Sequence, residues 1–163
     1  MAPVAYELMG KGRELADARG CRLVALAGMG PEGSLEDLEH LVCAGADEVV
    51  VCRDERLRQN DAEIYARLIC DLVAEHRPEA ILYGATAFGR ELAPGVAVRL
   101  QTGLTADCTQ LVIGDHKDAK SGREYKDLLY QIRPAFGGNI IATIVNPDNR
   151  PQMATVREGV MRR

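Results

Sequence analysis

The sequence has little of what nucleic-acid-binding and membrane proteins need. It contains no Trp, two Phe and five Tyr, so it offers few aromatic faces on which bases could stack. Its formal net charge is −4, whereas a protein that follows a phosphate backbone needs a basic face. No apolar run approaches the ~20 residues of a membrane span, and no signal-peptide pattern precedes the first predicted helix. These absences predict a cytoplasmic protein that neither binds nucleic acid nor inserts into a membrane.

The chain also lacks the cysteine spacing of a metal site and a histidine close in sequence to a nucleophile. Its cysteines are scattered without a C-x-x-C pair, which speaks against zinc and iron–sulfur sites. They are Cys21, Cys43, Cys52, Cys70 and Cys108. Each lies in or beside an apolar run, so we expect buried thiols in a reducing compartment. The three histidines, His40, His76 and His116, have no nucleophile close in sequence, so we expect them on the surface and expect no catalysis from this chain alone.

What the chain does have is the composition and alternation of an α/β domain. Hydrophobic residues make up 47% and charged residues 27%, as in globular proteins. Up to about residue 100, strand-like apolar runs alternate with helical patterns. A helix is expected over residues 4–19, and strands are expected over 21–27, 48–52 and 80–83, each followed by a helix. This alternation predicts right-handed βαβ units and a three-layer domain with a mostly parallel sheet.

The pattern changes after residue 107, where strands follow one another without helices. Two runs joined by a polar loop predict an antiparallel hairpin spanning about Cys108 to Arg133. Further strands are expected over 140–145 and 153–156. Residues 157–163 are polar and basic, as in a linker or a frayed end. We therefore expect one domain over residues 1–157, with 158–163 as the start of a linker or tail.

One loop resembles a dinucleotide-binding fingerprint. Gly28–Gly33 reads GMGPEG after a strand, and Asp54 lies where such a site has its ribose-binding acid, about 20 residues on. In such a site the helix begins inside the motif, so that its first N–H groups face the pyrophosphate. Pro31 removes one of these groups, and Ser34 with Asp37 forms a capping-box pattern that starts the helix after the motif. We therefore expect no dinucleotide here.

The most informative stretch runs from Ile81 to Thr109, where a short strand stops at Gly84 and a helix follows a small loop. The carboxyl end of a strand before a helix is where open α/β sheets bind ligands and attract anions. Thr86 and Arg90 in this turn would hold a phosphate or flavin edge, although the spacing alone favours an ordinary βα corner with a solvated arginine. Pro94 is tolerated only in a first helical turn, so the helix is expected to start just before it.

Three motifs in order resemble the N-terminal domain of the electron transfer flavoprotein alpha subunit. They are GATAFGRELAPGVAVRLQTGLTADCTQL from residue 84, IRPAFGGNIIATI from residue 132 and PQMATVREGVM from residue 151. YELMGKGRELAD from residue 6 and GADEVVV from residue 45 extend the resemblance over nearly the whole chain. The resemblance implies an adenine nucleotide alpha hydrolase-like, Rossmann-like fold. It also implies a strand before the first helix, which this sequence does not show.

The resemblance carries functional expectations. The family's heterodimer passes electrons from flavin dehydrogenases, or by bifurcation from NADH, to a downstream acceptor. The implied partners are a beta subunit and flavin dehydrogenases, and the implied cofactor of the complete heterodimer is FAD. The family's second domain carries most FAD contacts and has no counterpart in this sequence, so we expect a scaffold and flavin-interface wall that does not bind FAD alone. A stand-alone domain binding ATP or AMP and a purely structural assembly domain stay open as alternatives.

The resemblance also singles out a set of cofactor-binding candidates. They are Arg133, Phe136, Gly137, Thr86 and Arg90. Arg133 ends a strand, where its guanidinium would donate to a flavin edge and favour the anionic reduced form, or would pair with a neighbouring carboxylate in a structural turn. Asp107 suits either a turn in which it accepts a backbone N–H or a place where it orients a ligand.

Overall fold

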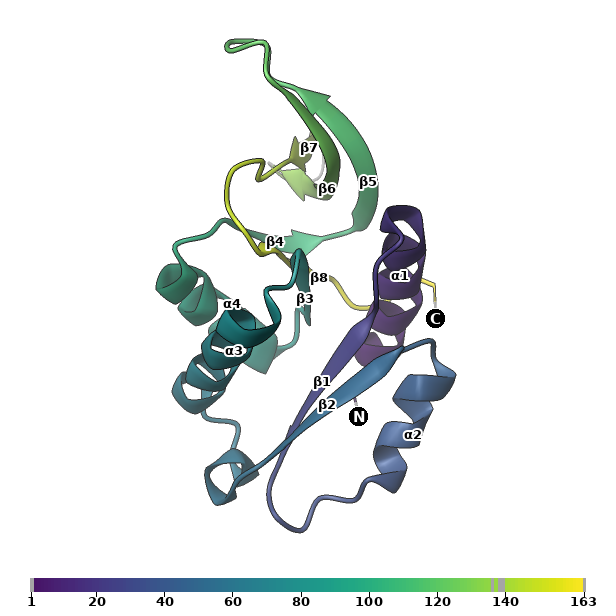
Figure 1. The fold of residues 1–163 in the computed structure, drawn as a ribbon, viewed down its shortest axis with the longest axis vertical. Coiled ribbons are helices and arrows are strands. Elements are labelled where there is room, and N and C mark those ends of the chain that lie inside the picture. The colour runs from purple at the N-terminus through teal and green to yellow at the C-terminus, as the bar shows by residue number, and fades with distance from the viewer. Residues whose placement is uncertain (1, 136, 138–139, 163) are drawn as a thin grey trace.

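The computed structural model describes residues 2–135, 137 and 140–162, apart from the side chain of Asp37, and shows an α/β domain (Figure 1). The helices are α1 (Pro3–Arg19), α2 (Glu36–Cys43), α3 (Ala62–His76) and α4 (Ala87–Leu100), with a 3-10 turn η1 (Glu55–Arg58). The strands are β1 (Val24–Met29), β2 (Glu48–Arg53), β3 (Ala80–Gly84), β4 (Leu104–Cys108), β5 (Gln110–Lys117), β6 (Glu124–Ala135), β7 (Ile140–Ile144) and β8 (Gln152–Val156).

The sheets confirm the expected mixture of parallel and antiparallel pairing. β1 and β2 form one parallel pair, β3-β8-β4 is a second parallel sheet, and β5-β6-β7 is antiparallel. In Figure 1 the helices α1 and α2 lie on one side of the parallel strands, α3 and α4 lie on the other, and the antiparallel sheet extends beyond them. The predicted hairpin is therefore confirmed, and β7 enlarges it to a three-stranded sheet.

The parallel strands form two sheets because β1 and β3 are not hydrogen-bonded to each other in the described part of the chain. Helices hold the two sheets together instead. On one face, α1 contacts β3 and places Met9 in a cluster with Ala25 of β1. On the other face, the hydroxyl of Tyr65 in α3 donates to the carbonyl of Gly28 in β1 (3.2 Å).

The strand β8 is the most buried element and comes from the end of the sequence. All five of its residues are buried, and it runs parallel to both β3 and β4. Met153 packs in one core cluster with α3 and α4, while Ala154 and Val156 pack in another with Leu15 of α1. β8 therefore joins the two sides of the core.

Two expectations about helices are wrong in detail. Pro94 lies inside α4, which begins at Ala87 and not just before the proline. The proline side of the helix is exposed, so the Arg90 carbonyl that loses its N–H partner faces water at little cost. The N-cap of α2 is Leu35 and not Ser34. The N-cap of α3 is Asp61, whose carboxylate accepts the N–H of Glu63 (2.9 Å).

The expectation of buried thiols is wrong for two of the five cysteines. Cys21 and Cys43 are exposed, Cys52 and Cys70 are half-buried, and Cys108 is buried. Cys21 lies in the turn before β1, and Cys43 ends α2 on its solvent side, so nearness to an apolar run did not mean burial. No helix within the described ranges is long and apolar enough to cross a membrane.

Candidate functional site

The carboxyl ends of three parallel strands meet at one edge of the domain. β3 ends at Gly84, β4 at Cys108 and β8 at Val156. The N–H of Ala85 donates to the carbonyl of Val156 (2.7 Å), and the N–H of Arg157 donates to the carbonyl of Cys108 (2.9 Å). These bonds bring three chain segments together at the edge where α/β folds place ligands.

The turn after β3 is built tightly around α4. The Thr86 hydroxyl caps the helix by accepting the N–H of Gly89 (3.1 Å). A Cβ on Gly89 would lie 2.0 Å from the carbonyl oxygen of Gly84, so only glycine fits there. Arg90 is exposed and its Nε donates to the carbonyl of Ala85 (2.9 Å). Thr86 and Arg90 thus take part in the structure of this corner, whatever else they contact.

Asp107 gathers the charges at this edge. Its carboxylate accepts two bonds from Arg157, at 3.2 Å from Nε and 2.6 Å from Nη2, and lies 3.6 Å from Nη2 of Arg90. Its backbone has a φ of 62°, a conformation that Asp tolerates better than most residues. Its N–H donates to the hydroxyl of Thr155 (2.8 Å). Asp107 therefore binds side chains of two segments, a role that neither sequence alternative anticipated.

Arg133 is the third cation of this group. It lies on β6, where the carbonyl of the preceding residue, Ile132, accepts the N–H of Thr109 (2.9 Å) just beyond β4. The hydrogen bond from Arg157 holds the pKa of Asp107 below its usual value, and the nearby charges of Arg90 and Arg133 lower it further. We call Arg90, Arg133, Arg157 and Asp107 the arginine cluster: Arg90 and Arg157 pair with the Asp107 carboxylate, and the charge of Arg133 is near enough to lower the pKa of that carboxylate.

The two alternatives for Arg133 differ in whether it has a carboxylate partner. Arg90 and Arg157 are both paired with Asp107. For Arg133 the hydrogen bond found among the described residues is a long one to the carbonyl of Pro134 (3.4 Å). Arg133 is half-buried, and among the described residues it is the arginine of the cluster for which no carboxylate partner is found.

The other candidates are placed less fully. Gly137 is exposed with a φ of 72°, and a Cβ added there would have no described atom within 4 Å other than those of its chain neighbours. Phe136 lies outside the described residues. Arg157 was missed because its segment reads as a polar tail. Its position directly after the apolar run of β8 was the available signal, since residues at strand ends face the ligand edge.

The GMGPEG loop uses its dinucleotide-like residues for packing. The helix α2 begins after the motif, as expected. A Cβ on Gly28 would meet the ring of Tyr65 at 2.6 Å, and one on Gly33 would meet the sulfur of Met29 at 2.5 Å. Asp54, the candidate ribose ligand, accepts two bonds from the Arg56 guanidinium, each 2.8 Å. The glycines and the acid on which the resemblance to a dinucleotide site rests thus have contacts within the chain.

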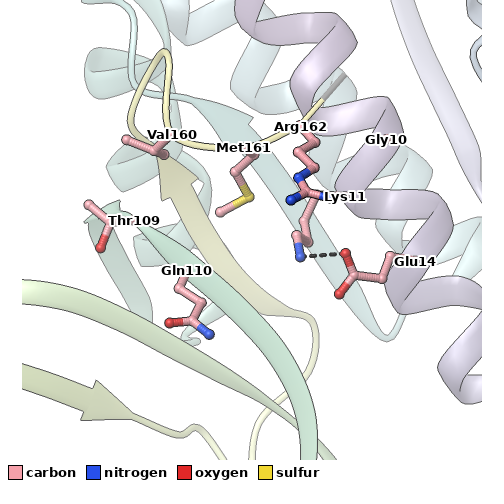
Figure 2. Close-up of a pocket in the computed structure, with 8 residues that line it drawn as sticks. All are labelled: Gly10, Lys11, Glu14, Thr109, Gln110, Val160, Met161 and Arg162. Atoms are coloured by element: carbon pink, nitrogen blue, oxygen red, sulfur yellow. Dashed lines mark hydrogen bonds and ion pairs between the residues drawn. The ribbon is translucent and has the colours of Figure 1, made fainter.

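A cavity of about 340 Å³ lies apart from the arginine cluster, between α1, the start of β5 and the C-terminal segment (Figure 2). Its lining residues are Gly10, Lys11, Glu14, Thr109, Gln110, Val160, Met161 and Arg162. The lining includes no member of the arginine cluster, and the ion pair of Lys11 with Glu14 (2.5 Å) occupies one side. The cavity is therefore not part of the candidate site.

Comparison with known proteins agrees with the three motifs. Residues 1–163 match the electron transfer flavoprotein domain family. The chain is 49% identical over 161 residues to the electron transfer flavoprotein subunit alpha of Thermoanaerobacterium thermosaccharolyticum, covering 98% of this chain and 45% of that protein. It is 50% identical over 158 residues to the subunit alpha of Clostridium acetobutylicum, covering 96% of this chain and 44% of that protein.

A third relative has a different name. The lactate dehydrogenase (NAD(+),ferredoxin) subunit LctC of Acetobacterium woodii is 45% identical over 155 residues, which cover 95% of this chain and 34% of that protein. The chain thus spans less than half the length of these curated relatives, whereas the match extends over nearly all of its own residues. The chain belongs to the electron transfer flavoprotein domain family.

Proposed function

We propose that this chain is the scaffold domain of an electron transfer flavoprotein alpha subunit. In this role it pairs with a beta subunit and forms one wall of a flavin-containing interface. The complete FAD-containing heterodimer carries electrons between dehydrogenases and a downstream acceptor, and this domain has no catalytic activity of its own. The observation that carries the proposal is the arginine cluster at the carboxyl edge, within a chain of this family.

The chemistry of the cluster suits a flavin edge. A flavin supplies the electron-transfer chemistry, and its reduced form carries negative charge on the pyrimidine side. Three guanidinium groups with one carboxylate leave a net positive charge at the edge. Arg133, which has no carboxylate partner among the described residues, would donate to a carbonyl or an anionic ring nitrogen, while Asp107 orients Arg157 and Arg90. The chain's own residues thus supply orientation and a positive field.

An exposed apolar edge beside the cluster supports pairing with another subunit. In the described part of the chain β7 pairs with β6 on one side only, and Arg133 lies opposite Ala142 of β7. Ile140 and Ile141 on this strand are 53% and 72% exposed. An unpaired strand edge with large apolar side chains is a surface that a partner covers in a stable complex.

The experiment mixes purified chain with FAD alone and with an electron transfer flavoprotein beta subunit. We expect a colourless chain that does not retain FAD on gel filtration, and a one-to-one complex with the beta subunit. Ile141→Lys should weaken the complex, because it places a charge in the apolar edge. Val98→Lys is the matched control, since Val98 is 77% exposed on α4, away from β7.

Two outcomes would count against the proposal. Tight stoichiometric FAD binding by the chain alone would contradict the proposal that this chain contributes only one side of the flavin site. A failure to bind the beta subunit would overturn the scaffold role. Retention of ATP or AMP by the purified chain would favour the nucleotide-binding alternative, which the family match does not favour.

A further inference from the structure

A buried carboxylate on α1 holds the segment that follows β8. Glu7 is 2% exposed, although it is a charged residue on a surface helix. Its carboxylate accepts the N–H of Gly159 (3.0 Å to each oxygen) and the N–H of Met161 (3.2 Å). These donors lie more than 150 residues away in sequence, at sequence separations of 152 and 154. Residues 157–162 were expected to be a linker or frayed end, and these contacts contradict a frayed end.

The segment 157–161 is attached to the domain at three points. At its start, the backbone and guanidinium of Arg157 bind Cys108 and Asp107. In its middle, Gly159 has a φ of 79°, which turns the backbone so that two N–H groups face Glu7. At its end, Met161 packs against the core cluster that contains Leu15.

Loss of the hydrogen bonds to Glu7 costs more free energy than loss of hydrogen bonds at the surface. A buried carboxylate without donors is strongly unfavourable, because desolvation is not offset. If residues 159–161 moved away, Glu7 would lose the donors described for it. The burial of Glu7 therefore opposes release of the segment, and the segment in turn satisfies Glu7.

From this geometry we propose that Glu7 is a positioning residue for the arginine cluster. Gly159 is only two residues beyond Arg157, so the bond to Glu7 fixes the backbone on the far side of Arg157 while β8 fixes it on the near side. The Arg157 guanidinium is then held in the orientation that binds Asp107. Helix α1 thus fixes the position of the cluster at the sheet edge. The functional importance of this contact rests on the proposed function, whereas the contact itself can be tested without flavin.

The test uses the chain of residues 1–163 without flavin and measures amide hydrogen exchange by NMR. Glu7→Gln keeps the size of the side chain and removes the charge. We expect it to speed exchange of the Gly159 and Met161 amides about tenfold or more, because charge-assisted bonds are replaced by weaker ones. The amides of Ala154 and Thr155 in β8 should change by less than about twofold, which shows that the effect is local.

Glu14→Gln is the matched control on the same helix. Its carboxylate is exposed and pairs with Lys11, so all of these amides should keep their exchange rates. If Glu7→Gln proves unfolded, Gly159→Ala opens the same contact from the segment side, because Ala is strained at a φ of 79°. It should speed exchange of the Met161 amide with α1 intact.

The second readout is the Nε–H signal of Arg157, which reports the order of its guanidinium. In Glu7→Gln and in Gly159→Ala this signal should show a more mobile Arg157 guanidinium, as it should in Asp107→Asn. Asp107→Asn should leave the amide exchange rate of Gly159 unchanged. Equal amide exchange rates at Gly159 and Met161 in wild type and Glu7→Gln would show that the Glu7 carboxylate does not hold the segment. An unchanged Arg157 Nε–H signal in a variant whose Gly159 and Met161 amides exchange faster would overturn the positioning role of Glu7. Neither result depends on flavin, so a failure here is separate from a failure of the proposed function.

Discussion

Removal of the Asp107 charge tests the arrangement of the arginine cluster by itself. Asp107→Asn keeps the shape of the side chain and its tolerance of a positive φ, but it loses the negative charge that two arginines share. The Asp107 side chain is 26% exposed, while those of Arg157 and Arg90 are 45% and 62% exposed, so solvent screens the pairs in part. We expect the free energy of unfolding to fall by about 1 kcal/mol, a value between the contribution of an exposed ion pair and that of a buried one.

The effect has a defined dependence on pH. The guanidinium of Arg157 lowers the pKa of Asp107 in the folded state below the unfolded value of about 3.9. The stabilisation is therefore fully present above that value and is lost as pH falls through the folded pKa. The difference between wild type and Asp107→Asn should be the same at about pH 7 and pH 5.5, and it should shrink below about pH 4.

Urea unfolding at these pH values measures the difference. With a slope of about 2 kcal/mol per molar, the midpoint of Asp107→Asn should fall by about 0.5 M at neutral pH. Asp17→Asn is the control, because Asp17 forms an exposed pair with Arg13 on one helix and should cost at most about 0.5 kcal/mol. Equal midpoints for wild type and Asp107→Asn at neutral pH, or a difference that persists undiminished to about pH 3, would refute the reasoning.

Two further predictions concern glycines. Gly89→Ala should destabilise the domain by about 2 kcal/mol or more, because the new Cβ would lie 2.0 Å from the Gly84 carbonyl, whereas Gly95→Ala in the same helix should stabilise it by about 0.5–1 kcal/mol, since its nearest contact is 3.7 Å. Urea unfolding checks both, and similar midpoints for the two variants would contradict the close packing at Gly89. Titration with NAD or NADP should produce no thermal shift, because side chains fill the GMGPEG loop, and a shift that Gly30→Val abolishes would prove the opposite.

The sequence predicted the local elements well and their assembly only in part. Strand and helix periodicity identified α1, β3 and the hairpin, because those patterns depend on neighbours in the chain. The insertion of β8 between β3 and β4 was not predicted. Alternation along a chain indicates which successive strands neighbour each other, whereas β8 is brought in from the end of the sequence by burial of its whole length.

The candidate site shows the same division. Thr86, Arg90 and Arg133 were named from a strand end and from motifs, and Arg90 and Arg133 belong to the cluster. Arg157 and the role of Asp107 were missed, because their bond joins residues 50 apart in sequence. Glu7 carried a weak signal, since it falls on the same helical face as the buried residues Val4 and Leu15. A charged residue at a core position indicates a partner without identifying it.

The flavin reduction potential of the complete heterodimer tests the central claim most directly. Arg133→Ala in the full-length complex removes the arginine of the cluster that has no carboxylate partner among the described residues, and spectroelectrochemistry measures the potential. Arg123→Ala is the matched control, because Arg123 is 69% exposed in the hairpin loop at the other end of the same sheet. We predict that Arg133→Ala lowers the potential by on the order of 20 mV, about 1 kcal/mol for a two-electron couple, and that Arg123→Ala leaves it unchanged. Equal potentials for wild type and Arg133→Ala would contradict a flavin-facing arginine cluster.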